Sequence, residues 1–125
     1  MTYAIETTNL TKKFGKSTAV NNLNLKIPVG TIFAFLGPNG AGKTTTIKTM
    51  VNIMTPNQGR ASVLGVDSRK LSPKEFSQIG YVSENQELPE WMTVQEFLKF
   101  CKAMYPRWDD QFCRNLLKEF DLPAA

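Results

Sequence analysis

The sequence of 125 residues contains no histidine and only two cysteines, and both scarcities narrow its possible chemistry. Without histidine, neither a histidine-containing zinc site nor histidine-based acid–base catalysis is available. Cys101 and Cys113 lack the spacing of a metal site, and both fall on the apolar faces of expected helices. We therefore expect two buried free thiols in a protein of a reducing compartment.

The sequence also lacks a long apolar run and a dense basic tract. No apolar stretch approaches the length of a membrane-spanning helix, and the first six residues do not resemble a signal peptide, so we expect a cytoplasmic protein. The net charge of +4 comes from scattered lysines and arginines that form no dense tract with interleaved aromatic residues, which does not indicate direct binding to nucleic acid. Hydrophobic content of 42% and charged content of 21% are typical of one globular domain.

What the sequence does contain is a glycine-rich stretch at residues 37–44. It matches the phosphate-loop pattern G-x-x-x-x-G-K-[ST] at every fixed position. The apolar run Ile32–Leu36 before it is typical of a strand buried on both faces, and residues 45–54 after it carry apolar side chains at helical spacing. Strand, glycine loop and helix in this order predict a phosphate-binding loop. The alternative is an ordinary glycine-rich turn between a strand and a helix.

The residue types of this stretch suit a nucleotide. Gly37, Gly40 and Gly42 have no Cβ, so the backbone can curl and turn successive N–H groups toward one anion. The N-terminus of the following helix adds partial positive charge. Lys43 can reach the outer phosphates, and the Thr44 hydroxyl is the expected protein ligand of Mg²⁺.

Shorter patterns predict the elements around the loop. Four strands are expected, at Tyr3–Leu10, Ala19–Ile27, Arg60–Leu64 and Gln78–Ser83, with a turn over Thr11–Gly15.

Helix-start signals lie at three points. Ser72 begins a capping pattern that ends at Glu75, Thr93 begins a capping box that ends at Glu96, and Asp109 can cap a last helix. The apolar stripes of the last two helices are expected to be core seams.

Four segments in this order resemble the ATP-binding subunits of ABC transporters. They are Leu10–Gly15, Gly37–Thr45, Gln78–Ser83 and the region from Thr93 onward. The resemblance implies an α/β fold, a P-loop NTPase of the ABC ATPase type, with an N-terminal antiparallel β part and the start of a helical subdomain. It implies an ATP-binding core at residues 1–88 and the beginning of the helical subdomain at residues 89–125.

The resemblance also assigns roles to single residues. Phe14 would stack on the adenine of ATP, or alternatively plug the side of the first strand. Glu84 occupies the place where the family usually has a glutamine, and would contact Mg²⁺ or the attacking water as a catalytic residue beside Lys43. Gln86 could take that role through a shifted loop, or the stretch could be a plain polar turn. The expected phosphate-binding residues are Gly37, Pro38, Asn39, Gly40, Ala41, Gly42, Lys43, Thr44 and Thr45.

Several motifs of the family are missing from the sequence. There is no Leu-Ser-Gly-Gly-Gln signature, no apolar Walker B strand ending in Asp-Glu and no switch histidine. The resemblance therefore covers roughly the N-terminal half of a nucleotide-binding domain, and the 125-residue chain alone is expected not to hydrolyse ATP.

For the complete protein, the resemblance implies an ATPase that drives substrate transport. Its partners would be a membrane-spanning subunit, docked near Leu88–Phe97, and a second ATP-binding subunit. The protein would lie on the inner face of the cell membrane. The alternatives are a non-transport ABC-type ATPase, a small P-loop phosphotransferase or GTPase, and a nucleotide-binding module without turnover. The guanine-reading motif Asn-Lys-x-Asp of a GTPase does not occur in the sequence.

Overall fold

The computed structural model describes residues 1–123 and divides into two compact units, Met1–Glu75 and Phe76–Ala125. The last two residues of the expected helical subdomain, 124 and 125, lie outside the described residues. Among residues 1–123, no helix is both long enough and apolar enough to cross a membrane.

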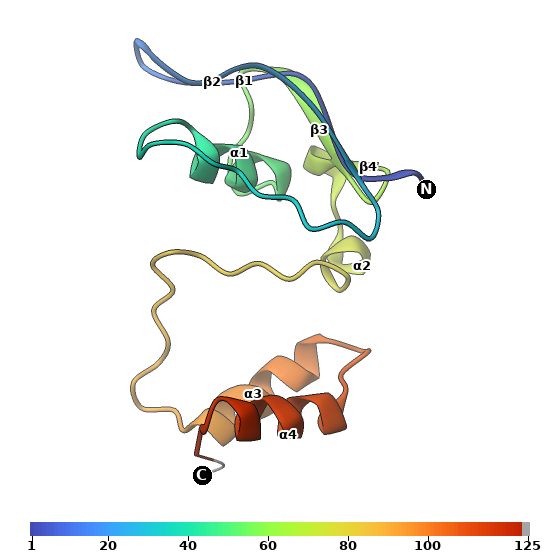
Figure 1. Ribbon diagram of the computed structural model, residues 1–125, viewed down its shortest axis with the longest axis vertical. Coiled ribbons are helices and arrows are strands. Elements are labelled where there is room, and N and C mark those ends of the chain that lie inside the picture. The colour runs from blue at the N-terminus through green and yellow to red at the C-terminus, as the bar shows by residue number, and fades with distance from the viewer. Residues whose placement is uncertain (124–125) are drawn as a thin grey trace. The chain divides into compact units, whose positions relative to one another are not determined.

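The first unit is built on one antiparallel sheet with the strand order β2-β1-β3-β4. Its strands are β1 (Tyr3–Phe14), β2 (Ser17–Pro28), β3 (Gln58–Val63) and β4 (Val66–Asp67). Figure 1 shows the long hairpin of β1 and β2 next to the helix α1 (Lys43–Met50), which contacts β2 and β3. The buried apolar side chains of this unit are Leu10, Val20, Ile27, Met50, Ala61 and Val63.

The first strand is longer than the sequence predicts. The expected turn over Thr11–Gly15 is wrong, because β1 continues to Phe14 and pairs there with Ser17 of β2. Only the bend around Gly15, with φ of 56°, separates the two strands. The physical reason is cross-strand pairing, which propagates past the exposed lysines that resemble a turn in the sequence. Phe14 consequently sits at the very end of a paired strand.

Two expected strands do not form. Ile32–Leu36 and Gln78–Ser83 have no regular secondary structure, and the side chains of Ile32 and Leu36 are 103% and 92% exposed. A strand needs a neighbour to bind its backbone N–H and C=O groups. Within residues 1–123 the paired strands form a single sheet, and neither segment joins it.

The boundary between the units is marked by short helical turns. The 3₁₀ helix η1 (Ser68–Lys70) follows β4, and α2 (Pro73–Phe76) begins after Ser72. The backbone N–H of Ser72 donates to Oε2 of Glu75 over 2.9 Å, so the helix start predicted at Ser72 is confirmed.

The second unit contains the helices α3 (Val94–Met104) and α4 (Asp110–Glu119). The predicted capping box is confirmed: Thr93 Oγ1 accepts from the Glu96 N–H at 3.2 Å, and Glu96 Oε2 accepts from the Thr93 N–H at 2.9 Å. Asp109 caps α4 by accepting the Phe112 N–H at 2.9 Å. Both caps satisfy N–H groups that a helix start leaves without intrahelical acceptors.

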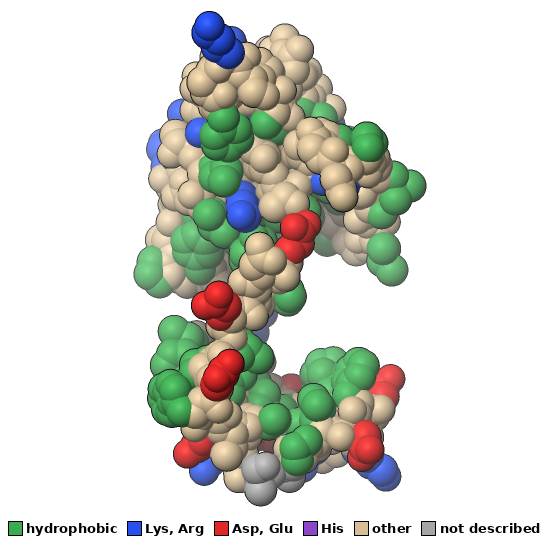
Figure 2. Space-filling view, turned by 90° about the vertical axis from the view of Figure 1, so that its left-hand side faces the viewer, with side chains coloured by type: hydrophobic (Ala, Val, Ile, Leu, Met, Phe, Trp, Pro, Cys, Tyr) green, Lys and Arg blue, Asp and Glu red, His purple; other side chains and the backbone are tan. Residues whose placement is uncertain are grey.

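The apolar faces of these helices are more exposed than they would be if they were packed in a hydrophobic core. Phe112 and Phe120 are 60% and 66% exposed, and none of the described residues of α3 or α4 is fully buried. Cys101 and Cys113 are free thiols as expected, but they are half-buried and not fully buried. Figure 2 shows hydrophobic side chains gathered on the visible surface of this unit.

Candidate nucleotide-binding site

The phosphate loop runs directly into α1, whose first residue is Lys43. Gly40 and Gly42 have φ of 85° and 90°, a left-handed backbone that side chains other than glycine rarely adopt. The N–H of Ala41 donates to the carbonyl of Pro38 over 3.2 Å and closes a turn within the loop. Two of the glycines predicted for this loop are therefore required by its backbone.

Gly42 lies directly against β2. A Cβ on Gly42 would overlap the carbonyl oxygen of Ala19 and would lie 3.5 Å from a methyl group of Val20. Val20 pairs with Lys12 of β1, near the hairpin end that carries Phe14. The last glycine of the loop is therefore packed on β2 close to the end of the β1–β2 hairpin, where β1 ends at Phe14.

The ammonium group of Lys43 is turned into the loop. Its Nζ donates to the carbonyl of Gly37 and, over 2.8 Å, to the carbonyl of Pro38. The loop thus holds a positive charge beside its own backbone, which is the arrangement expected for binding the oxygen atoms of a polyphosphate.

The first turns of α1 are rich in threonine. The N–H and hydroxyl of Thr46 both donate to the carbonyl of Gly42, over 2.9 and 2.7 Å, and the Thr49 hydroxyl donates to the carbonyl of Thr45 over 2.7 Å. Thr44 and Thr45 are half-buried at the helix start. No side chain caps this helix at Gly42, and its first turn holds no acidic residue. A bound anion at this end would meet the first N–H groups and the positive end of the helix dipole.

Phe14 is half-exposed at the end of β1, with 49% of its surface accessible. The structure therefore does not support the alternative that Phe14 is a buried plug. Its ring lies beside the ammonium of Lys12, with 5.2 Å between Nζ and the ring centroid. The sequence predicts that Lys12 lies in a turn, and no local sequence pattern predicts its contact with the Phe14 ring.

Glu84 and Gln86 are exposed residues of the second unit, and Glu84 lies in a turn. The structure thus assigns the phosphate loop and the expected Q-loop residues to different units. The role of Glu84 stays a prediction.

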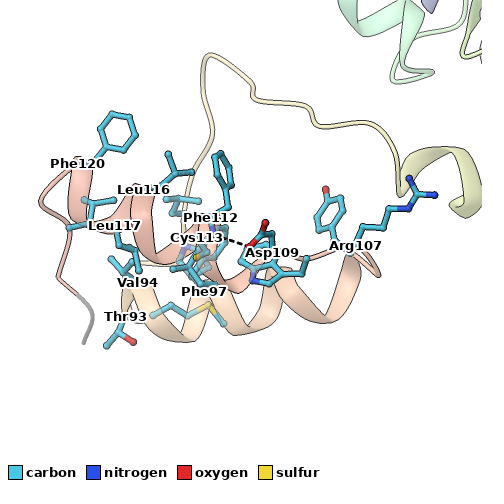
Figure 3. A pocket seen from close by; sticks show the side chains of 17 residues that line it. Thr93, Val94, Phe97, Arg107, Asp109, Phe112, Cys113, Leu116, Leu117 and Phe120 are labelled. Carbon is cyan, nitrogen blue, oxygen red and sulfur yellow. Dashed lines mark hydrogen bonds between the residues drawn. The ribbon is translucent and has the colours of Figure 1, made fainter. Parts of the chain in front are cut away.

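The second unit holds a separate apolar groove of about 760 Å³ between α3 and α4. Figure 3 shows Phe97, Phe112 and Leu116 among the side chains that line it. The stripes that the sequence predicts as core seams therefore face one another across an open groove. The helical spacing of the apolar residues identifies its lining, but local spacing alone does not show that the groove is open.

A glycine loop that opens a helix, packs on an antiparallel sheet and holds a lysine ammonium defines a phosphate-loop nucleotide-binding domain. The model of the ABC transporter family matches residues 20–125, and the chain belongs to this family.

Curated relatives carry the same assignment. The chain is 42% identical over 101 residues to the probable multidrug ABC transporter ATP-binding protein YbhF of Escherichia coli, covering 81% of this chain and 18% of that protein. It is 42% identical over 99 residues to the bacitracin transport ATP-binding protein BcrA of Enterococcus faecalis, covering 79% of this chain and 32% of the relative. The chain thus spans between 18% and 32% of the length of these two relatives.

A solved ATP-binding subunit of an ABC transporter has the same fold. It superimposes with a TM-score of 0.81 at 28% identity, over 95% of this chain and 51% of the solved one. The chain is therefore the N-terminal part of an α/β ABC ATPase domain, and the fold is incomplete as the sequence predicts. These relatives give no support to a small phosphotransferase or a non-transport ATPase.

Proposed function

We propose that this chain is part of an ATP-binding subunit whose complete form couples ATP binding and hydrolysis to the transport of a substrate. The observation that carries the proposal is the phosphate loop: Gly42 is fixed against Ala19, and the Lys43 ammonium is held at the loop carbonyls. The two curated relatives are named for the transport of different substrates, multidrug and bacitracin. Both are named as ATP-binding proteins, so they support ATP binding by this chain without indicating which substrate is transported.

In this proposal the first unit binds the nucleotide. Residues 37–45 hold the phosphates through backbone N–H groups, and Lys43 offsets the charge of the outer phosphates. The aromatic ring of Phe14, half-exposed at the hairpin end, stacks on the adenine. The functional core extends over residues 1–88, and the helical subdomain begins at residue 89.

Mg²⁺ fits the oxygen donors that the chain offers. The hydroxyl of Thr44 and the carboxylate of Glu84 are the ligand types that this ion prefers alongside water and phosphate oxygens. When bound, the ion would neutralise charge on the phosphates. Glu84 and Lys43 would then be the residues of this chain that act in hydrolysis, with Glu84 contacting the ion or the attacking water.

The complete protein would work at the inner face of the cell membrane. It would bind a membrane-spanning subunit and a second ATP-binding subunit, and ATP would lie between the two ATP-binding subunits. The groups missing from this sequence, the signature and the carboxylate after a Walker B strand, would come from the remainder of the domain and from its partner copy.

Titration with a fluorescent ATP analogue tests the proposal. Lys43→Ala removes the ammonium of the loop and should weaken binding about 30-fold or more, because loss of one member of a buried charge pair costs about 2 kcal/mol or more. The matched control is Lys48→Ala, which removes the same charge from the last turn of the same helix and should leave affinity unchanged. Equal affinities of the unaltered chain and Lys43→Ala would contradict the proposal.

A further inference from the structure

Lys12 joins two parts of the first unit that are distant in the sequence. Its Nζ donates to the backbone carbonyl of Thr55 over 2.8 Å and lies 5.2 Å from the centroid of the Phe14 ring. Thr55 belongs to the segment between α1 and β3, so one ammonium group connects the ring at the hairpin end to the chain that leaves the phosphate-loop helix.

The backbone around Lys12 is fixed to the same segment. The N–H of Asn57 donates to the carbonyl of Thr11 over 2.8 Å, and the N–H of Lys13 donates to Oδ1 of Asn57 over 2.7 Å. Two residues after Asn57, a Cβ on Gly59 would overlap the carbonyl of Asn9. Strand β1 and the segment at Thr55 are thus joined by several hydrogen bonds, and the bond to the Thr55 carbonyl positions the Lys12 ammonium.

The position of this charge affects the Phe14 ring. The ammonium lies over the ring, where the negative face of an aromatic quadrupole attracts a cation. The side chain of Phe14 nevertheless remains 49% exposed, so ring surface is left for a second flat partner. A ring that is already oriented loses less conformational entropy when a base stacks on it.

We propose that Lys12 is a positioning residue for the nucleotide base: it holds the Phe14 ring in the orientation that stacks on adenine and makes no contribution through the phosphates. This inference rests on the proposed function, in which Phe14 contacts the base. In this inference Lys12 contributes to the affinity of the protein for the adenine base, whereas Lys43 contributes to its affinity for the phosphates.

Calorimetric titrations of the full chain with ATP and with inorganic tripolyphosphate separate the two contributions, because tripolyphosphate has no base. Lys12→Met should weaken ATP binding about three- to fivefold, the size expected for one exposed cation–π contact, and leave tripolyphosphate binding unchanged. Lys12→Arg should restore ATP affinity, since arginine also binds aromatic faces. Lys13→Met is the matched control: it removes the same charge from the next residue, retains the backbone bond to Asn57 and should change neither titration.

A double-mutant cycle with Phe14→Ala completes the test. Phe14→Ala alone should weaken ATP binding, and adding Lys12→Met to it should have no further effect, because the two side chains act as one unit. If Phe14→Ala leaves ATP affinity unchanged, the stacking role in the proposed function fails, and the role of Lys12 fails with it. If Phe14→Ala weakens ATP binding but Lys12→Met does not, only the role of Lys12 is overturned. It is equally overturned if Lys12→Met weakens tripolyphosphate as much as ATP, or acts undiminished in the Phe14→Ala background.

Discussion

The carbonyl oxygen of Ala19 occupies the space that a side chain on Gly42 would need. This contact joins the last glycine of the phosphate loop to strand β2, 23 residues earlier in the chain. Two separate features of the structure therefore require glycine at position 42. One is the φ of 90°, and the other is the close approach of a neighbouring backbone.

These two reasons can be separated by comparing Gly42→Ala with Gly40→Ala. Both glycines have φ near the same value, 90° and 85°, but nothing lies within 4 Å of a Cβ built on Gly40. Gly40→Ala should lower the free energy of unfolding by about 1 kcal/mol through backbone strain. Gly42→Ala should lower it by about 3 kcal/mol, because β2 must also move. Urea unfolding monitored by circular dichroism measures both, and equal losses would show that the Ala19 contact is unimportant.

The 125-residue chain should bind ATP without hydrolysing it. It contains the phosphate loop but lacks a carboxylate after a Walker B strand and lacks the signature segment. Phosphate release should therefore equal that of Lys43→Ala, which serves as the background. Turnover of about 1 per second or more, within the range of ordinary enzymes, would show that another residue activates water. Glu84→Gln would then be the first variant to examine.

The apolar segment Ile32–Leu36 should cause the chain to self-associate. Ile32 and Leu36 are almost completely exposed, and the backbone of the segment forms no strand pairs that would satisfy it. Exposed apolar chain with available N–H and C=O groups is a template for pairing with another copy.

Light scattering should show dimers or larger species for the unaltered chain, and mainly monomer when Ile32 and Leu36 are both replaced by glutamate. Glutamate at both Phe112 and Phe120 is the matched control, because these residues are 60% and 66% exposed but lie in or directly after the helix α4, whose backbone is already hydrogen-bonded. A monodisperse monomer of the unaltered chain with a sharp, high-temperature unfolding transition would contradict this prediction.

Asp67 should make the first unit sensitive to strong acid. The Arg69 side chain donates to its carboxylate over 3.0 and 2.8 Å, and the Arg69 N–H donates over 2.9 Å, which together lower the pKa of Asp67 to about 2. In the unfolded chain its pKa is about 3.9. Because folding favours the ionised carboxylate, this stabilisation is complete above about pH 4 and is lost as the pH falls toward 2.

The expected magnitude is modest, less than about 1 kcal/mol, because solvent screens an ion pair near the surface. Urea unfolding between pH 2 and pH 6 should show a smaller pH dependence for Asp67→Asn than for the unaltered chain. Arg69→Met removes the two side-chain hydrogen bonds but keeps the bond from the backbone N–H of residue 69, so its pH dependence should lie between those of the unaltered chain and Asp67→Asn. Parallel curves for all three proteins would show that this pair does not couple folding to pH.

The sequence by itself determined the features that depend on neighbouring residues. The capping box of Thr93 and Glu96 and the cap at Asp109 involve groups within three positions of one another. The phosphate loop likewise consists of eight consecutive residues, so the residue pattern alone identifies its glycines and its lysine. Such features form wherever the local chain supplies both donor and acceptor.

Only the tertiary structure decided the features that need a distant partner. Ile32–Leu36 has the composition of a buried strand, but strand formation requires a second strand beside it, and none of the described strands pairs with it. Phe14 lies at the end of β1 because its pairing with Ser17 carries the strand through residues that resemble a turn. The bond from Lys12 to Thr55 crosses 43 positions of sequence, and no local pattern specifies it. Long-range contacts of this kind depend on how the sheet and α1 pack, and that packing exists only in the folded chain.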